Sequence, residues 1–253
     1  MGKFEGKVAV VTGAGQSVGF ETAKMFVEEG ATVIMAGRTL SKVENAAKAI
    51  GSEKAIPYKM DVGSEEDWKA LVSYIKEKFG EFDYLVNNAA VLYQKTIHDM
   101  SLEEFRETER CNMESVFLGM KYCYEVLKKG CYSAIVNVSS VGAFKSGPSA
   151  GNDPGYNSTK AGIRNMTKHA AYLYAKDCIK VNSVHPGGIN TPMRDEYLKK
   201  YPERAAASAA IKPIPPHVSE PEEVAAVILF ACDPFIKTMT GSELVIDCGN
   251  MTM

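Results

Sequence analysis

The chain has 253 residues, and 29 Lys and Arg against 31 Asp and Glu give it a formal net charge of −2 at pH 7. This balance argues against a nucleic-acid partner, because proteins that bind nucleic acids neutralise phosphates with clustered basic residues. With 45% hydrophobic and 24% charged residues, the composition excludes disorder of the whole chain and fits one globular domain over residues 1–253.

Short apolar runs alternate with longer amphipathic patterns along the chain. The first half has strand Val8–Val11, helix Phe20–Glu29, strand Ala31–Ala36, a helix opened by a capping box at Ser41-x-x-Glu44, strand Ala55–Met60 and a helix opened by Ser64-x-x-Asp67. The second half has strand Phe82–Val86, a long helix from Ser101-x-x-Glu104 to Gly130, strand Ser133–Val138, helix Tyr156–Ala175, strand Ile179–Val184, helix Pro221–Cys232 and strand Glu243–Asp247. Because parallel neighbours need long crossover connections, this alternation predicts an α/β fold with a doubly wound parallel sheet of about seven strands and helices on both faces.

The six cysteines and four histidines are scattered and form neither C-x-x-C nor H-x-x-x-H. We therefore expect no metal site, and we expect reduced thiols in a cytoplasmic protein. The apolar runs Val8–Val11 and Ala225–Cys232 are far shorter than a membrane-spanning helix, so we expect no membrane partner.

A glycine-rich turn joins the first strand to the first helix, with the sequence Thr12-Gly13-Ala14-Gly15-Gln16-Ser17-Val18-Gly19. Glycines let the backbone approach a pyrophosphate closely, and the helix N-terminus attracts its negative charge. The spacing is not G-x-G-x-x-G, because Val18 stands three residues after Gly15. The turn therefore indicates a dinucleotide site only together with other signals, since such turns are often only turns.

The second strand is followed by Arg38, with no acidic residue where a dinucleotide-binding turn would hold the ribose 2′-hydroxyl of NAD. An arginine at this place can face the 2′-phosphate of NADP with two hydrogen bonds. A solvated arginine is the competing interpretation. We favour NADP(H) as the cofactor, with NAD(H) as the alternative.

Tyr156 and Lys160 lie four residues apart and so share one helix face. An ammonium close to a phenol lowers its pKa from about 10 toward the working range of a proton donor. An isolated pair of this spacing is often only a surface pair. The fifth strand, however, ends at Ser139-Ser140, at the sheet edge where open α/β folds bind ligands. One hydroxyl there is suited to hold a substrate oxygen, while for Ser139 we favour a strand-end hydrogen bond.

These motifs resemble the short-chain dehydrogenase/reductase family over nearly the whole chain. The matching segments are Thr12-Gly13-x-x-x-Ser17-x-Gly19, Asp61-Val62, Asn87-Asn88-Ala89-Ala90, Asn112, Ser140, Tyr156-x-x-x-Lys160, Pro186-Gly187 with Thr191, and Asp247-Cys248-Gly249. Two positions depart from the family pattern, since Ser17 and Ala90 stand where the family has glycine. Ser17 affects the expected pyrophosphate contact more than the expected catalytic group.

The resemblance implies a single Rossmann-like, dinucleotide-binding catalytic domain that transfers hydride between nicotinamide and a carbonyl or alcohol carbon. It implies Tyr156 as the acid/base, Lys160 as the group that lowers the pKa of Tyr156 and contacts the nicotinamide ribose, Ser140 as the group that orients the oxygen, and Asn112 as the holder of a relay water. The cofactor contacts it implies are Gly13, Gly15, Ser17, Val18, Gly19, Arg38, Asp61, Val62, Asn88, Tyr156, Lys160, Pro186, Gly187, Ile189 and Thr191.

The substrate is less defined by the sequence. The resemblance makes residues 191–217 an insertion that covers the substrate, and Met193, Tyr197 and Tyr201 in it suggest a bulky apolar molecule such as a hydroxysteroid or bile acid. Residues 144–155 form a Gly- and Pro-rich loop that is a second candidate pocket wall. Simple packing, a 3-oxoacyl thioester substrate and a cofactor-sensing protein without catalysis remain the alternatives. The resemblance also implies a homotetramer, which pairs the helices expected at 101–129 and 156–175.

Overall fold

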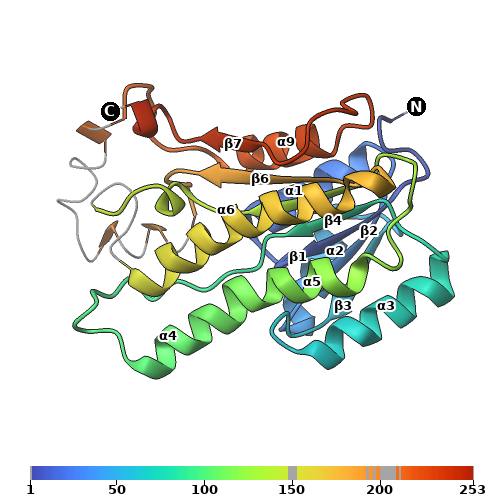
Figure 1. The fold of residues 1–253 in the computed structure, drawn as a ribbon, viewed down its shortest axis with the longest axis horizontal. Coiled ribbons are helices and arrows are strands. Elements are labelled where there is room, and N and C mark those ends of the chain that lie inside the picture. Colours follow the sequence, from blue (N-terminus) through green and yellow to red (C-terminus); the bar gives the residue numbers. More distant parts are fainter. Residues whose placement is uncertain are drawn as a thin grey trace.

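A single parallel sheet forms the centre of the fold in the computed structural model. The structure describes residues 2–147, 153–191, 194–195, 198–199, 209–210 and 212–252. Within these residues the sheet has seven strands in the order β3-β2-β1-β4-β5-β6-β7 (Figure 1). The strands are β1 (Val8–Thr12), β2 (Thr32–Gly37), β3 (Ala55–Lys59), β4 (Tyr84–Asn87), β5 (Ala134–Val138), β6 (Lys180–Pro186) and β7 (Glu243–Ile246). This doubly wound α/β topology confirms the predicted fold class.

Helices cover both faces of the sheet. They are α1 (Ser17–Glu28), α2 (Leu40–Ile50), α3 (Glu65–Phe79), α4 (Leu102–Thr108), α5 (Ser115–Cys123), α6 (Pro154–Tyr174) and α9 (Pro221–Cys232). In Figure 1, α3, α5 and α6 lie on the near side of the sheet, and α1 and α9 pack together on the other side. The long connections between parallel strands supply these helices, as the alternation of the sequence predicts.

Alternate residues of the central strands enter two separate cores. Val10 and Leu85 belong to the core under α3, α5 and α6, whereas Val11 and Val86 belong to the core under α1 and α9. Successive side chains of a strand point to opposite faces, so a strand covered on both sides must be apolar throughout. The uninterrupted apolar run of β1 therefore has a direct structural cause.

The N-termini of three helices can be compared with the N-caps predicted from the sequence. Ser64 accepts a hydrogen bond from Asp67 N, and Ser101 forms a full capping box with Glu104, as predicted. The predicted capping box at Ser41 is wrong, because α2 begins at Leu40 and its N-cap is Thr39, which follows β2 almost directly.

The predicted long helix from Ser101 to Gly130 ends earlier than expected. It runs through α4, a π-helical segment at Glu109–Glu114 and α5, and it ends at Cys123. Leu127 then forms a parallel bridge with Phe82, which turns the chain away from the helix axis before Gly130. No helix among the described residues is long and apolar enough to cross a membrane.

Candidate active site

The turn after β1 has the backbone geometry of an anion cradle. Gly13 lies at φ +68°, and a Cβ on Gly19 would stand 2.3 Å from the Gly13 carbonyl oxygen, so α1 can approach β1 this closely only with glycine there. The N-cap of α1, Gln16, makes no side-chain capping bond. The first N–H groups of a helix have no intrahelical acceptor, so this end of α1 fits a phosphate group.

The backbone conformation of Ser17 is one that favours glycine. Its backbone lies at φ +51°, in the left-handed region that side chains with a Cβ rarely adopt. The departure from the family pattern therefore places a strained residue at the start of α1, on the segment predicted to face the pyrophosphate.

Asn88 secures the turn from the neighbouring strand. Its backbone N donates to Thr12 Oγ1 at 2.9 Å, and its Nδ2 donates to the Thr12 carbonyl at 2.9 Å. Thr12 Oγ1 also accepts from Ala89 N at 3.1 Å. Asn88 thus holds the loop after β4 against the end of β1, beside the predicted cofactor site.

Ser140, Tyr156 and Lys160 come together at the carboxyl edge of the sheet. The Lys160 ammonium is buried, donates to the Val138 carbonyl at 2.7 Å and lies 5.3 Å from the centre of the Tyr156 ring. Ser140 interacts with Tyr156 through its hydroxyl and accepts from Gly142 N at 3.0 Å. Ser139 instead donates to the Lys160 carbonyl at 2.9 Å, as befits the structural role favoured for it.

The electrostatics of this trio differ from the sequence-based expectation. Burial raises the pKa of Tyr156, the hydrogen bond with Ser140 opposes that rise, and the Asp153 carboxylate adds to it. Burial also lowers the pKa of Lys160 to about 8. The net direction of the Tyr156 pKa is therefore upward, opposite to the expected lowering, and burial is its largest cause.

Asn112 lies in the π-helical segment between α4 and α5 and is buried. Its Oδ1 accepts from Val91 N at 2.8 Å, and its Nδ2 donates to the Val91 carbonyl at 3.0 Å and approaches Thr159 Oγ1 at 3.4 Å. The side chain therefore bonds the loop after β4 and touches the helix that carries Tyr156 and Lys160.

Asp153 is a site residue that the sequence-based analysis missed. Its carboxylate has no exposed surface and accepts from three backbone N–H groups, those of Tyr93, Gln94 and Tyr156, at 2.8 to 2.9 Å. It is the N-cap of α6 and also holds the 93–94 segment beside that helix. The signal present in the sequence was an Asp directly before Pro154, which is typical of a helix start.

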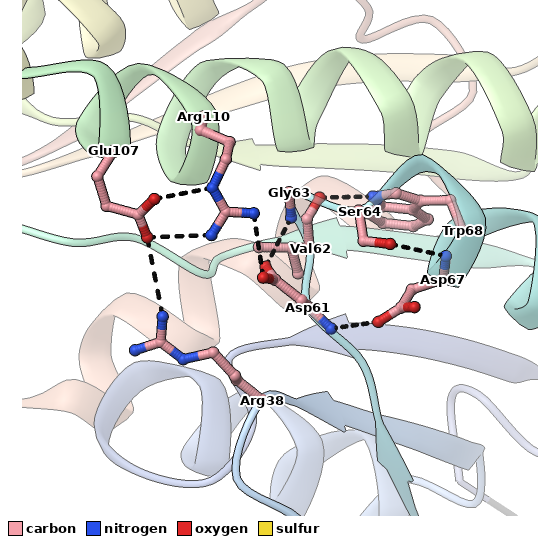
Figure 2. Close-up of polar contacts among 9 residues, drawn as sticks. All are labelled: Arg38, Asp61, Val62, Gly63, Ser64, Asp67, Trp68, Glu107 and Arg110. Carbon is pink, nitrogen blue, oxygen red and sulfur yellow. Dashed lines mark hydrogen bonds and ion pairs between the residues drawn. The ribbon is translucent and has the colours of Figure 1, made fainter. Parts of the chain in front are cut away.

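Arg38 and Asp61 meet through two residues that the sequence-based analysis also missed, Glu107 and Arg110 (Figure 2). Arg110 donates two hydrogen bonds to the Glu107 carboxylate, from Nε to Oε2 at 2.8 Å and from Nη2 to Oε1 at 3.0 Å. Arg110 Nη1 also donates to Asp61 Oδ2 at 3.0 Å. Arg38 Nη1 lies 3.8 Å from Glu107 Oε1.

The loop after β3 is rigidly held beside this cluster. Asp67 accepts from Asp61 N at 2.7 Å, and the Val62 carbonyl accepts from Trp68 Nε1 at 2.8 Å. Burial acts to raise the pKa of Asp61, but hydrogen bonds from Gly63 N and Arg110 lower it overall. The two residues of the predicted adenine side thus present an ionised carboxylate next to Arg110.

The segment after β6 completes the edge. Gly187 N donates to the Ile246 carbonyl at 2.8 Å, and a Cβ on Gly187 would stand 2.9 Å from Asp247. Ile189 forms a parallel bridge with Ser219, and Thr191 Oγ1 accepts from Arg194 N at 3.2 Å. Cys248, at φ +57°, again puts a side chain where a left-handed turn favours glycine.

The structure describes only part of the two predicted pocket walls. Met193, Tyr197 and Tyr201 lie outside the described residues, as do most of the residues between 191 and 211 and the segment 148–152. Among the residues that the structure does describe, no group of three His, Cys, Asp or Glu side chains is arranged to hold a metal ion.

Comparisons with known proteins cover almost the whole chain. A family model described as enoyl-(acyl carrier protein) reductase matches residues 13–251. The NADP-dependent (R)-specific alcohol dehydrogenase of Lentilactobacillus kefiri is 36% identical over 98% of this chain and 97% of its own length. The cyclohexanol dehydrogenase of Acinetobacter sp. (strain SE19) is 33% identical over 97% of this chain and 95% of its own.

The name of a third relative specifies a larger substrate. The 3-alpha-(or 20-beta)-hydroxysteroid dehydrogenase of Mycobacterium bovis (strain ATCC BAA-935 / AF2122/97) is 32% identical over 99% of this chain and 91% of its own length. Each of the three similarities covers at least 97% of this chain.

Proposed function

The chain belongs to the short-chain dehydrogenase/reductase family, a family of oxidoreductases, and we propose that it interconverts a secondary alcohol and the corresponding ketone with NADP(H). One observation carries the proposal. A buried lysine, a tyrosine and a serine hydroxyl from two separate elements converge at the edge of the sheet, the same edge at which β1 ends in the glycine-rich turn.

The chemistry divides between cofactor and protein. A bound nicotinamide supplies or accepts the hydride, and the protein places the reacting carbon and moves the proton. Tyr156 gives its phenolic proton to the carbonyl oxygen during reduction, or takes the hydroxyl proton during oxidation. Ser140, which already interacts with Tyr156, holds the same oxygen and stabilises charge that develops on it.

Lys160 prepares Tyr156 for this exchange. Its buried ammonium is fixed by the Val138 carbonyl, which leaves its remaining protons for a neighbouring phenolate or a ribose hydroxyl. When the phenol loses its proton, a nearby ammonium stabilises the anion. Asn112, held by Val91 and touching Thr159, positions the loop beside this helix and is the proposed support for a relay water.

NADP(H) fits the residues at the end of β2. Arg38 is 67% exposed on its side chain and so is free to turn toward a phosphate. No acidic residue follows β2, and Arg38 is the charged group in Gly37-Arg38-Thr39. The remaining predicted contacts follow the carboxyl ends of parallel strands, from Gly13 to Gly19 after β1, at Asp61-Val62 after β3 and from Pro186 to Thr191 at the end of β6, which supports the proposal.

The substrate class that we favour is a bulky, apolar secondary alcohol such as a hydroxysteroid or bile acid. The relatives named above include, by their names, a cyclohexanol dehydrogenase and a hydroxysteroid dehydrogenase, whose substrates differ in size. Residues 191–217 are proposed to cover the substrate. A 3-oxoacyl thioester is the second candidate, because a 3-oxoacyl-[acyl-carrier-protein] reductase of Thermotoga maritima is 34% identical over 98% of this chain.

We further propose that the protein acts in the cytoplasm as a homotetramer. Phe117 on α5 and Tyr172 and Leu173 on α6 are 49%, 83% and 45% exposed, which gives these helices apolar surface suited to pairing with a second copy. Light scattering during size exclusion tests the assembly, and a monomeric mass at micromolar concentration contradicts it.

The decisive experiment follows NADPH absorbance with a panel of cyclic ketones, steroid ketones and 3-oxoacyl thioesters. We expect turnover by the wild type and a loss of about 10²- to 10⁴-fold in Tyr156→Phe, with NADPH binding retained. Binding of NADPH without turnover across the panel would instead favour a cofactor-sensing protein. Equal activity of Tyr156→Phe and wild type would remove Tyr156 from the mechanism.

A further inference from the structure

Four charged side chains of alternating sign form a cluster beside the predicted adenosine site. This charged cluster comprises Arg38 after β2, Asp61 after β3, Glu107 at the end of α4 and Arg110 in the π-helical segment (Figure 2). Two cations and two anions cancel, so the cluster offers a phosphate no net positive charge. The feature matters because Arg38 is the residue proposed to recognise a ribose 2′-phosphate.

Glu107 is held far more firmly than Arg38. Both of its oxygens are engaged by Arg110, and Arg110 in turn is fixed by Asp61 and packs on Gly63, where a Cβ would stand 2.2 Å from Nη1. The hydrogen bond from Arg110 lowers the pKa of Glu107 against the effect of burial, so the carboxylate is ionised at neutral pH. A fixed negative charge therefore stands next to Arg38.

Arg38 itself is loosely held. Its ion pair among the described residues is the 3.8 Å approach of Nη1 to Glu107 Oε1, and its side chain is 67% exposed. An exposed pair at this distance is weak and screened by salt, so a ligand phosphate can replace it. The arriving phosphate must then compete with Glu107 for the guanidinium and meet the repulsion of its carboxylate.

We propose that Glu107 is a specificity-determining residue of the cofactor site, one that limits the preference for NADP(H) over NAD(H) by competing with the ribose 2′-phosphate for Arg38. The inference rests on the proposed function, because it concerns the same adenosine site. It also accounts for a site that has an arginine for the 2′-phosphate and yet no excess of positive charge.

The test compares adenosine 2′,5′-bisphosphate with adenosine 5′-monophosphate, each titrated calorimetrically into the full chain at low salt. We expect Glu107→Gln to tighten bisphosphate binding by about 5- to 10-fold and to leave monophosphate binding within about twofold. Raising the salt concentration should shrink this gain. In an Arg38→Ala background the gain should be smaller, since the guanidinium for which Glu107 competes is gone.

Glu103→Gln is the matched control, because it removes the same charge from an exposed position of the same helix. Glu107→Ala serves if the Gln variant does not fold, with circular dichroism as the check. The inference is overturned if both Glu107 variants leave the ratio of the two affinities unchanged, or if Glu103→Gln tightens bisphosphate binding equally. Either result leaves the proposed function standing. If the wild type binds neither nucleotide, the proposed function is overturned with it.

Discussion

The Asp153 carboxylate accepts a hydrogen bond from the backbone N–H of Tyr156 at 2.8 Å, with Asp153 at the N-cap of α6. The other carboxylate oxygen accepts from Tyr93 N and Gln94 N, both at 2.9 Å. One buried side chain thus sets the start of the helix that carries Tyr156 and attaches the segment after β4 to it. The position of the proposed acid/base therefore depends on a residue other than Ser140 and Lys160.

We predict that Asp153→Ala lowers the free energy of unfolding by about 1–3 kcal/mol, because it leaves three part-buried backbone N–H groups without their acceptor and removes an N-cap. Urea denaturation measures the loss. Asp99→Ala, at an exposed position in the same region, is the control and should change stability by less than about 0.5 kcal/mol. Similar losses in both variants would argue against the role of Asp153.

Lys160 predicts a pH dependence of stability. Burial lowers the pKa of the Lys160 ammonium from its ordinary value of about 10.5 to about 8, so between these values the unfolded chain binds more protons than the folded one. Stability from this group therefore rises as the pH increases from 8 toward 10.5. The wild type should gain on the order of 2 kcal/mol relative to Lys160→Met over this window.

Urea denaturation of both proteins near pH 7 and near pH 9.5 measures that difference. Lys176→Met, at an exposed position just after α6, is the control and should run parallel to the wild type. Parallel curves for Lys160→Met and wild type would mean that the ammonium is not destabilised by burial.

We predict that replacing Ser17 with glycine stabilises the fold. Its φ of +51° costs a residue with a Cβ about 1–2 kcal/mol, whereas glycine adopts it freely and pays only in unfolded-state entropy. Ser17→Gly should raise the free energy of unfolding by about 0.5–1 kcal/mol.

The same substitution at Ser41 should have the opposite sign. Ser41 is exposed and lies inside α2, so Ser41→Gly should destabilise by about 0.5 kcal/mol. Thermal denaturation of both variants checks the pair. A loss of stability in Ser17→Gly would show that the serine side chain contributes more than its backbone strain costs.

Arg38 predicts the cofactor preference. Arg38→Ala should raise the Michaelis constant for NADPH by about 10- to 100-fold, because a guanidinium–phosphate contact is lost, and should change that for NADH by less than about threefold. Steady-state kinetics with both cofactors measure the two constants. Arg106→Ala, on the exposed side of α4, is the control. Equal effects on the two cofactors would contradict the role given to Arg38.

Local patterns in the sequence carried most of the fold. The alternation of apolar runs with amphipathic segments predicted the sheet and its helices, and Pro221–Cys232 has the predicted bounds. Two of the three predicted serine N-caps were correct because a cap is a contact between residues three apart. The third was wrong at Ser41, because the N-cap of α2 is Thr39, two residues earlier, in the short turn after β2.

The sequence by itself determined the elements, the glycine turn and the shared helix face of Tyr156 and Lys160, because each depends on residues within a few positions of one another. Only the tertiary structure decided which distant side chains meet, such as Arg110 with Asp61 and Asp153 with Gln94. It also decided the direction of the Tyr156 pKa shift, since burial is a property of the folded core and not of the local spacing.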